Sequence, residues 1–275
     1  MQTKIIDGKK IRDSIKEELI SKVTFFSGEV PRLVLFRVGE NPVVDIFIRA
    51  KKRFGESVGV DVEIQNLPDS ITEDELIEKI IFFSKPNTGI VVQLPLPKHI
   101  DSKNILNSIP VRNDVDMLSE KSLELLSAGK SAILPPVVGA INAIFLLEGV
   151  DLYSKNIVVI GRGKLVGEPT MLWLQSLGLD PILITRSTED ASGKIASADV
   201  VISGAGKPSL ISAEMIKEGS IMIDAGASEL AEKLVGDIDE SVLGKASLYT
   251  PVPGGIGPIT VAILFRNLLE INKKQ

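Results

Sequence analysis

Short apolar runs alternate with helix-period segments over almost the whole chain, and this alternation restricts the fold more than any other feature. Runs such as 157–160 are short, continuous and rich in β-branched residues, so they predict strands that are buried on both faces. Buried strands separated by helical segments are typical of βαβ units, in which neighbouring strands pair in parallel. The sequence therefore predicts an α/β fold.

The predicted elements form two series, separated near Pro135 and Pro136, and a chain of 275 residues is long enough for two domains. In the first series we expect strands at 32–38, 60–67 and 89–93, and helices at 10–24, 42–58 and 72–84. In the second series we expect strands at 156–160, 181–185, 199–203 and 220–224, and helices at 140–147, 169–177 and 260–272. The sequence thus predicts a three-layer α/β domain over residues 1–135 plus the C-terminal helix (about 260–275), and a Rossmann-like domain over 136–259, with a cleft between them.

Charge and composition exclude several classes of function. The net charge is −5, from 31 basic and 36 acidic residues, and no basic stripe is visible, so we expect no nucleic-acid partner. Cysteine is absent and His99 is the only histidine, so disulfides and thiolate chemistry are excluded and we expect no metal. The N-terminus has no signal pattern, and no apolar run approaches about 18 residues. We expect a cytoplasmic protein without a membrane partner.

A glycine-rich turn follows the predicted strand 156–160. Gly161, Gly163 and Gly167 have the spacing G-x-G-x-x-x-G, one residue longer than the common dinucleotide fingerprint, and a helical segment comes next. Glycines at a strand-to-helix turn let the backbone approach a pyrophosphate, and the helix N-terminus supplies amide donors. The alternative is a tight turn that binds no ligand.

The end of the next predicted strand bears on the choice of cofactor. NAD enzymes usually place an acidic residue there, which accepts a hydrogen bond from the ribose 2′-hydroxyl. This chain has Thr185, Arg186, Ser187 and Thr188 instead, and Arg162 lies in the preceding turn. Guanidinium groups pair with phosphate oxygens, so these residues favour the 2′-phosphate of NADP. Solvated surface arginines are the alternative.

Lys51 lies beside the apolar stripe of an amphipathic helix. The stripe of the predicted helix 42–58 has helical spacing and contains Val43, Phe47, Ala50, Phe54 and Val58. Lys51 follows Phe47 by four residues, so the two project from the same side. Such a lysine usually extends to water. In a cleft, partial desolvation would lower its pKa toward a range useful for proton transfer.

Three other segments carry polar or glycine-rich patterns at places where α/β proteins bind ligands. Gln93 ends a strongly apolar strand, and the prolines after it prevent the strand from continuing. Asp114 and Asp116 flank a single valine. The segment 253–258 has three glycines between two prolines, which suggests a rigid loop close to a flat ligand. A loop-bound amide and an ordinary turn are the alternatives for the first and third segments.

Together these segments resemble the methylenetetrahydrofolate dehydrogenase/methenyltetrahydrofolate cyclohydrolase family, over essentially the whole chain. The matching motifs occur in the family's order, at residues 4–9, 38–51, 92–97, 113–116, 161–169 and 253–260. The resemblance implies NADP-dependent oxidation of 5,10-methylenetetrahydrofolate and hydrolysis of the methenyl product, in one-carbon metabolism and purine biosynthesis. It also implies a folate-binding catalytic domain, an NADP-binding domain and a homodimer.

The resemblance also implies roles for individual residues. Lys51 would be the catalytic lysine, Gln93 would assist it, and Asp116 would anchor the pterin ring. The implied substrate-binding residues are Phe47, Pro95, Gly254, Gly255, Gly257 and Pro258. The implied cofactor-binding residues are Gly161, Arg162, Gly163, Val166, Gly167, Arg186, Ser187 and Gly206.

Some positions depart from the family pattern. Phe47 stands where a tyrosine is usual, Met117 and Leu118 replace a glycine and an aromatic residue, Gly163 replaces a serine, and the segment 134–139 lacks a hydroxyl near the cofactor. These departures leave two alternatives open: a dehydrogenase with weak cyclohydrolase activity, and a non-catalytic NADP-binding module. Another two-domain amino- or hydroxy-acid dehydrogenase would fit the cofactor half but not the glutamine strand.

Overall fold

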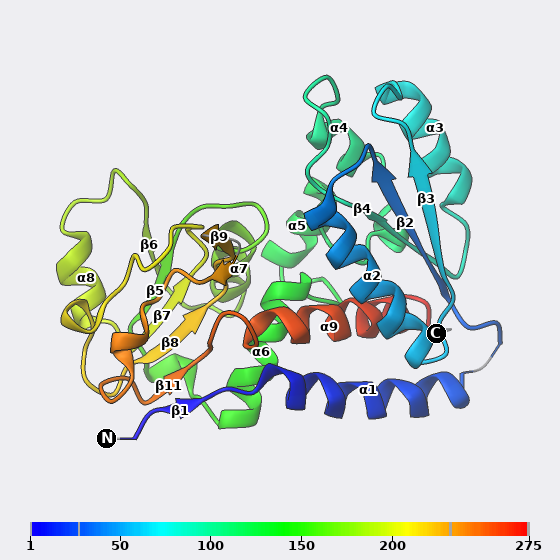
Figure 1. Ribbon diagram of the computed structural model, residues 1–275. Coiled ribbons are helices and arrows are strands. Elements are labelled where there is room, and N and C mark those ends of the chain that lie inside the picture. Colours follow the sequence, from blue (N-terminus) through cyan, green and yellow to red (C-terminus); the bar gives the residue numbers. More distant parts are fainter. Residues whose placement is uncertain (1, 27, 231–232, 274–275) are drawn as a thin grey trace. The chain divides into compact units, whose positions relative to one another are not determined.

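The chain folds into two compact units, shown in Figure 1 as a computed structural model that describes residues 2–26, 28–230 and 233–273. The six-stranded unit comprises residues 1–12, 126–129 and 137–260, and the three-stranded unit comprises residues 13–125, 130–136 and 261–275. Each unit is built on a parallel sheet with helices around it. The predicted α/β class with two domains is confirmed.

The three-stranded unit has a parallel sheet of order β3-β2-β4. The central strand β2 (Arg32–Val38) pairs with β3 (Val62–Leu67) along one edge and with β4 (Thr88–Val92) along the other. The five residues of β4 are all buried, as expected for a strand covered on both faces. The helices α2 (Pro42–Ser57) and α3 (Glu73–Phe83) connect these strands in sequence.

Alternate residues of these strands pack on opposite faces of the sheet. Val34 and Phe36 of β2 belong to a buried cluster with residues of α3 and of the short helix α4 (Ser102–Asn107). On the same side, Thr72 closes the N-terminus of α3 with a reciprocal capping box, which explains why a helix begins there. The fold on this side follows from Val34 and Phe36, which share one face of a strand buried on both faces, and from the capped start of α3.

The C-terminal helix α9 (Ile256–Ile271) packs with α2 in the three-stranded unit. The rings of Phe54 and Phe265 lie 5.4 Å apart, and a Cβ on Gly55 would overlap both Val62 and Phe265. The buried Asn267 donates from Nδ2 to the carbonyl oxygens of Val115 (3.0 Å) and Leu134 (2.8 Å). The end of the chain is therefore an integral part of this unit.

The six-stranded unit has a parallel sheet of order β1-β11-β8-β7-β5-β6. Its strands are β1 (Lys4–Ile5), β5 (Ile157–Ile160), β6 (Ile182–Ile184), β7 (Val200–Ser203), β8 (Ile221–Asp224) and β11 (Leu248–Tyr249). The sequence-based boundary placed residues 1–135 in the other domain, but β1 pairs here with β11 through the register Lys4↔Leu248. A strand of two residues has no periodic pattern, so only the fold reveals its partner.

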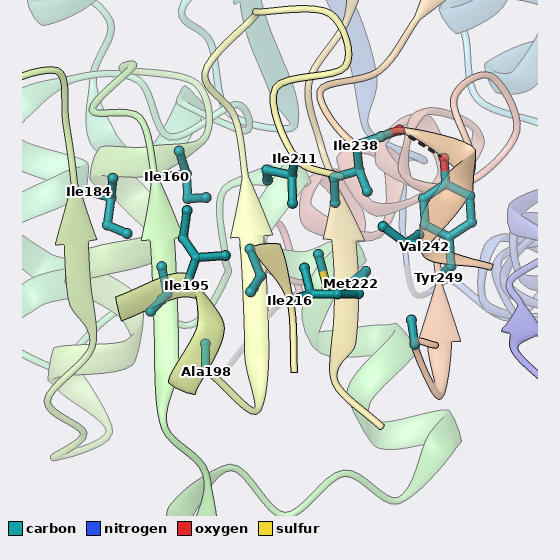
Figure 2. Close-up of a cluster of buried hydrophobic side chains, with 13 residues drawn as sticks. Ile160, Ile184, Ile195, Ala198, Ile211, Ile216, Met222, Ile238, Val242 and Tyr249 are labelled. Atoms are coloured by element: carbon teal, nitrogen blue, oxygen red, sulfur yellow. Dashed lines mark hydrogen bonds between the residues drawn. The ribbon is translucent and has the colours of Figure 1, made fainter. Parts of the chain in front are cut away.

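One face of this sheet is covered by a core of aliphatic side chains, drawn in Figure 2. Ile160, Ile184 and Met222 point from the strands toward Ile195 of helix α8 (Ala191–Ser197) and toward the segments around Ile211 and Ile238. Tyr249 closes the cluster and donates from its hydroxyl to the carbonyl oxygen of Ile238 at 3.4 Å. Apart from Tyr249 and the methionines, this core is aliphatic, and aromatic residues make up 4% of the chain.

The remaining elements connect and cover the sheets. In the described part of the chain they are the helices α1 (Gly8–Thr24), α5 (Glu120–Ser127), α6 (Pro136–Glu148) and α7 (Gly167–Ser176), the antiparallel strands β9 (Ser228–Leu230) and β10 (Lys233–Val235), and the 3-10 helices Val111–Asn113, Leu152–Ser154, Ala213–Met215 and Glu240–Val242. Among the described residues, no helix has both the length and the apolar character needed to cross a bilayer.

Candidate active site

Lys51 and Gln93 meet in the three-stranded unit. Lys51 projects from α2, is half-buried, and donates from Nζ to Oε1 of Gln93 at 3.0 Å. Gln93 directly follows β4 and continues its pairing, because its backbone N–H donates to the carbonyl oxygen of Phe36 at 2.9 Å. Its Nε2 donates to the carbonyl oxygen of Leu94 at 3.3 Å, which fixes the amide oxygen toward the lysine. The strand end and the helix thus hold the two side chains together.

Asp114 prepares the position of Asp116. Asp114 forms a parallel bridge with Ile90 of β4, so the chain that leads to Asp116 runs alongside the end of β4. The buried Asp114 carboxylate accepts hydrogen bonds from Ser119 Oγ (2.6 Å), Ser119 N (3.0 Å) and Ser122 Oγ (2.7 Å). It is therefore fully engaged in structure, whereas Asp116 is only half-buried. The sequence grouped the two aspartates, and the structure separates their environments.

Burial and mutual attraction determine the ionisation of Lys51 and Asp116. Desolvation lowers the pKa of Lys51 from its ordinary value, and the negative charge of Asp116 opposes that change. Desolvation likewise raises the pKa of Asp116, the charge of Lys51 opposes it, and the charge of Asp114 adds to it. A lysine whose pKa is lowered from its ordinary value is neutral more often and can both accept and donate a proton, so this centre is suited to acid–base catalysis.

The residue after Asp116 explains one departure from the family pattern. Met117 has a φ of +54°, in the left-handed region that costs a non-glycine residue about 1 kcal/mol. Glycine, which the resemblance expects there, adopts this conformation freely. The Met117 side chain is buried, and its sulfur accepts a hydrogen bond from Ser131 Oγ at 3.7 Å. Packing of the methionine offsets the backbone strain.

The glycine-rich turn connects β5 to α7 in the six-stranded unit, as the sequence predicts. Gly161 has a φ of +94°, and a Cβ on it would lie 2.9 Å from the carbonyl oxygen of Gly204. A Cβ on Gly167, at the start of α7, would overlap the carbonyl oxygen of Gly161. Gly163 has no such contact, because a Cβ there would lie 3.8 Å from Gly204. Two of the three glycines are thus required by close backbone packing, which fits a dinucleotide cradle.

Donors are available around this turn. The residue before α7 is Val166, whose side chain cannot cap the helix. Glu168 N–H donates to the carbonyl oxygen of Gly163 at 3.1 Å and Pro169 has no N–H, so the N–H of Gly167 is the donor that the first turn offers to an anion. Arg162 is exposed in the turn, and Arg186 and Ser187 are exposed after β6. The Ser187 hydroxyl lies 3.1 Å from Thr185 Oγ1. These groups fit a phosphorylated ribose at the carboxyl ends of β5 and β6.

The glycine–proline segment is ordered by the N-terminal part of the chain. Gly8 donates from its backbone N–H to the carbonyl oxygen of Gly254 at 2.9 Å, and a Cβ on Gly8 would overlap the carbonyl oxygen of Gly255. Gly254 has a φ of +112°. The predicted loop is shorter than expected, because α9 already begins at Ile256 and its first turn contains Gly257 and Pro258, where proline is favourable.

The sequence-predicted residues therefore lie in both units. Lys51, Gln93, Asp116, Phe47 and Pro95 belong to the three-stranded unit, and Phe47 is 46% exposed one turn before Lys51. The six-stranded unit holds the remaining predicted residues, which are Gly161, Arg162, Gly163, Val166, Gly167, Arg186, Ser187, Gly206, Gly254, Gly255, Gly257 and Pro258.

Sequence reasoning missed two buried carboxylates of the six-stranded unit, Asp224 and Asp237, which bind the loops after β7 and β8. Asp237 directly follows Gly236 and Asp224 lies two residues before Gly226, but a nearby glycine alone does not mark a buried acid.

A parallel sheet with a glycine cradle, together with a separate unit that carries a desolvated lysine–amide–carboxylate centre, defines a dinucleotide-dependent enzyme of two α/β units. The family models agree with this class. The tetrahydrofolate dehydrogenase/cyclohydrolase catalytic domain matches residues 6–116, and the NAD(P)-binding domain of the same family matches residues 135–275. The chain belongs to the tetrahydrofolate dehydrogenase/cyclohydrolase family.

Full-length relatives support the assignment. The chain is 39% identical to the Bifunctional protein FolD of Wolbachia sp. subsp. Drosophila simulans (strain wRi), over 96% of this chain and 94% of the relative. It is 36% identical to the Bifunctional protein FolD of Moorella thermoacetica, over 100% of both chains.

Solved structures agree. The bifunctional enzyme FolD of Campylobacter jejuni is 34% identical with a TM-score of 0.95, covering 98% of this chain and 99% of that one. The Trypanosoma brucei enzyme, solved with NADP cofactor and an inhibitor, is 30% identical with a TM-score of 0.94, covering 99% and 98%.

Proposed function

We propose that this chain oxidises 5,10-methylenetetrahydrofolate to 5,10-methenyltetrahydrofolate with NADP and hydrolyses that product to 10-formyltetrahydrofolate, using Lys51, Gln93 and Asp116. The observation that carries the proposal is the hydrogen bond from Lys51 Nζ to Gln93 Oε1, made by a desolvated lysine within the electrostatic reach of Asp116. Relatives that are named bifunctional favour two activities over a dehydrogenase with weak hydrolysis.

The oxidation requires positioning more than proton chemistry. A hydride leaves the methylene carbon, and the resulting methenyl cation is stabilised by its two flanking nitrogens. NADP, when bound, supplies the hydride acceptor. The residues of this chain then have to orient the folate: the Asp116 carboxylate accepts hydrogen bonds from pterin N–H donors, and the half-exposed ring of Phe47 offers an apolar surface beside Lys51.

The hydrolysis requires a proton to move twice. Water adds to the methenyl carbon, and Lys51 in its neutral form takes one proton from that water. The resulting ammonium gives this proton to the ring nitrogen as the carbon–nitrogen bond breaks, and the remaining hydroxyl proton is released as the formyl C=O forms, so the reaction frees one proton overall. The Gln93 amide oxygen accepts a hydrogen bond from Lys51 in either form and so holds Nζ in place. No histidine or cysteine is needed, in agreement with the composition.

Substitution of Asp116 tests the folate site. Asp116→Ala is expected to lower kcat/KM for NADP reduction with methylenetetrahydrofolate by at least about 100-fold, because hydrogen bonds to a charged group are lost in a desolvated site. Initial rates followed at the absorbance of the reduced cofactor measure this. The control is Asp74→Ala, which changes an aspartate in the first turn of α3. A wild-type chain without activity would support the non-catalytic module instead.

Substitution of Arg186 tests the choice of cofactor. Arg186→Asp is expected to raise KM for NADP by about 10- to 100-fold and to leave KM for NAD nearly unchanged, because a cation that pairs with the 2′-phosphate becomes an anion. Parallel assays with both cofactors measure the ratio. Lys155→Asp, which makes the same change in charge next to the start of β5, is the control. Equal losses for NADP and NAD would contradict the assignment of Arg186.

We also propose that the enzyme works in the cytoplasm as a homodimer, as the family resemblance implies. The finding that no described helix could span a bilayer is compatible with this location. Light scattering on the purified chain tests the assembly, since a dimer has twice the mass of the 29.6 kDa chain.

A further inference from the structure

The carboxylate of Asp237 is fully buried and is surrounded by donors from one short segment. Oδ2 accepts hydrogen bonds from Ser203 Oγ (2.7 Å), Ala205 N (2.7 Å) and Gly206 N (3.3 Å), and Oδ1 accepts one from Lys207 N (2.7 Å). Ser203 is the last residue of β7, and the other donors belong to the loop that follows it. One side chain thus fixes the whole course of the chain from 203 to 207.

Three of these donors are consecutive backbone N–H groups, which form an anion-binding concavity of the kind that usually holds a phosphate. Gly206 has a φ of +63°, a conformation that favours glycine and turns the chain around the carboxylate. Ala205, Gly206 and Lys207 are exposed on their other side, while Asp237 lies beneath them. The concavity faces inward and is occupied by the protein's own anion.

A second buried carboxylate fixes Asp237 in turn. Asp224, the last residue of β8, accepts hydrogen bonds from Gly226 N (2.9 Å) and Ile238 N (2.8 Å), so it holds the residue next to Asp237. A Cβ on Gly226 would overlap the Asp237 carboxylate, and a Cβ on Gly236 would overlap the Asp224 carboxylate. Each carboxylate therefore packs tightly against one of the two glycines, and this packing restricts the position of the Asp237 side chain.

The segment held by Asp237 packs against the glycine cradle. In the sheet, β8, β7 and β5 are neighbours, and the loop after β7 therefore lies beside the turn after β5. A Cβ on Gly161 would lie 2.9 Å from the carbonyl oxygen of Gly204, and a Cβ on Gly204 would overlap the side chain of Val166. Ligands of parallel sheets bind beyond these strand ends. The position of the 204–207 loop therefore shapes one wall of the cofactor site.

We propose that Asp237 is a positioning residue for NADP, which holds the 204–207 loop against the cradle from beneath. Because the N–H groups of Ala205, Gly206 and Lys207 are used by Asp237, this loop contacts the cofactor through its exposed side and not through phosphate contacts. The diphosphate then takes its donors from the turn after Gly161 and from the start of α7. This inference rests on the proposed use of NADP.

The test replaces Asp237 by Asn, which keeps the shape but exchanges one acceptor oxygen for an NH₂ group facing N–H donors. Calorimetric titration with NADP is expected to show a Kd raised by at least about 10-fold, because the new NH₂ group leaves either Lys207 N or the pair Ala205 N and Gly206 N without an acceptor. KM for the folate substrate should stay within about 2-fold, and amide exchange measured by NMR should accelerate at residues 205–207. The control is Asp199→Asn, at the opposite end of β7, where Asp199 accepts from Asn156 N at 2.9 Å.

Two results would overturn the proposal: an unchanged Kd for NADP despite faster exchange at residues 205–207, or equal weakening of NADP binding in the Asp199→Asn control. If Asp237→Asn does not fold, Ser203→Ala removes one donor to the same carboxylate and should weaken NADP binding by about 3-fold; an unchanged Kd there would also overturn it. Measurements on the wild-type chain distinguish failure of this proposal from failure of the proposed function. If the wild type reduces NADP and the Asp237 variant binds NADP normally, only the role of Asp237 is contradicted.

Discussion

Replacing Lys51 by methionine is expected to lower the rate of methenyltetrahydrofolate hydrolysis by about 10²- to 10⁴-fold, the range contributed by a positioned acid–base group. Methionine keeps the length and the apolar stem of the side chain but cannot carry a proton. Hydride transfer from the methylene carbon needs no proton from Nζ, so the dehydrogenase rate should fall much less. The hydrogen bond to Gln93 is lost in both reactions, which makes the ratio of the two rates the informative quantity.

The two rates are measured separately, by loss of methenyltetrahydrofolate absorbance for hydrolysis and by formation of reduced cofactor for oxidation. Lys52→Met is the matched control, because Lys52 is the next residue of α2, is exposed and lies 3.9 Å from Glu56 on the helix surface. Equal losses of both activities in Lys51→Met would show that the lysine only shapes the folate site, and an unchanged hydrolase rate would exclude any role for it.

The second large effect concerns stability against pH. Burial raises the pKa of Asp224 to about 6, above its ordinary value of 3.8 in the unfolded chain, although the backbone N–H groups of Ile238 and Gly226 oppose this. Between about pH 4 and pH 6 the folded state therefore holds a proton that the unfolded state has released. Stability contributed by protonated Asp224 is present below pH 4 and is lost as pH rises through 6, by about 3 kcal/mol at most.

Asp224→Asn has no such proton, so its free energy of unfolding relative to wild type is expected to rise by up to about 3 kcal/mol between pH 4 and pH 7. Urea unfolding followed by the fluorescence of Trp173, the only tryptophan and a buried residue of α7, reports on the six-stranded unit. In the control Asp199→Asn the difference from wild type should stay nearly flat between pH 4 and pH 7, because the hydrogen bond from Lys217 lowers the pKa of Asp199 and its contribution changes mostly below about pH 4. Parallel pH curves for Asp224→Asn and wild type would contradict the prediction.

Much of the fold could be predicted because its strands are buried on both faces. The apolar run at 32–38 coincides with β2, and the expected strands of the second series lie within about two residues of β5, β6, β7 and β8. The two-residue strands β1 and β11 could not be found, since they are defined only by pairing with distant segments. The helix α8 was also missed, because its sequence ASGKIAS has low helix propensity and only Ile195 is buried.

The sequence predicted which residues belong to the candidate site better than it predicted their hydrogen bonds and burial. The apolar stripe predicted beside Lys51 was partly wrong, because Phe47 and Ala50 are exposed. The buried side of α2 carries Val44, Ile48 and Phe54 instead. The strand end placed Gln93, but its hydrogen bond with Lys51 depends on how α2 packs on the sheet.

Nothing in a single sequence distinguishes Asp114, which is enclosed by serines, from Asp116. Asp237 was missed for the same reason, because its donors come from residues about thirty positions earlier in the chain.

The position of α9 affects when the three-stranded unit can fold during synthesis. Asn267 of α9 bonds the carbonyl oxygens of Val115 and Leu134, and Phe265 packs on Phe54, so the three-stranded unit lacks part of its interior until the end of the chain is available. On the ribosome, the nascent three-stranded unit would therefore wait until α9 has been synthesised and has left the exit tunnel. Removal of residues 261–273 of α9 and its end should accordingly destabilise the three-stranded unit more than the six-stranded one.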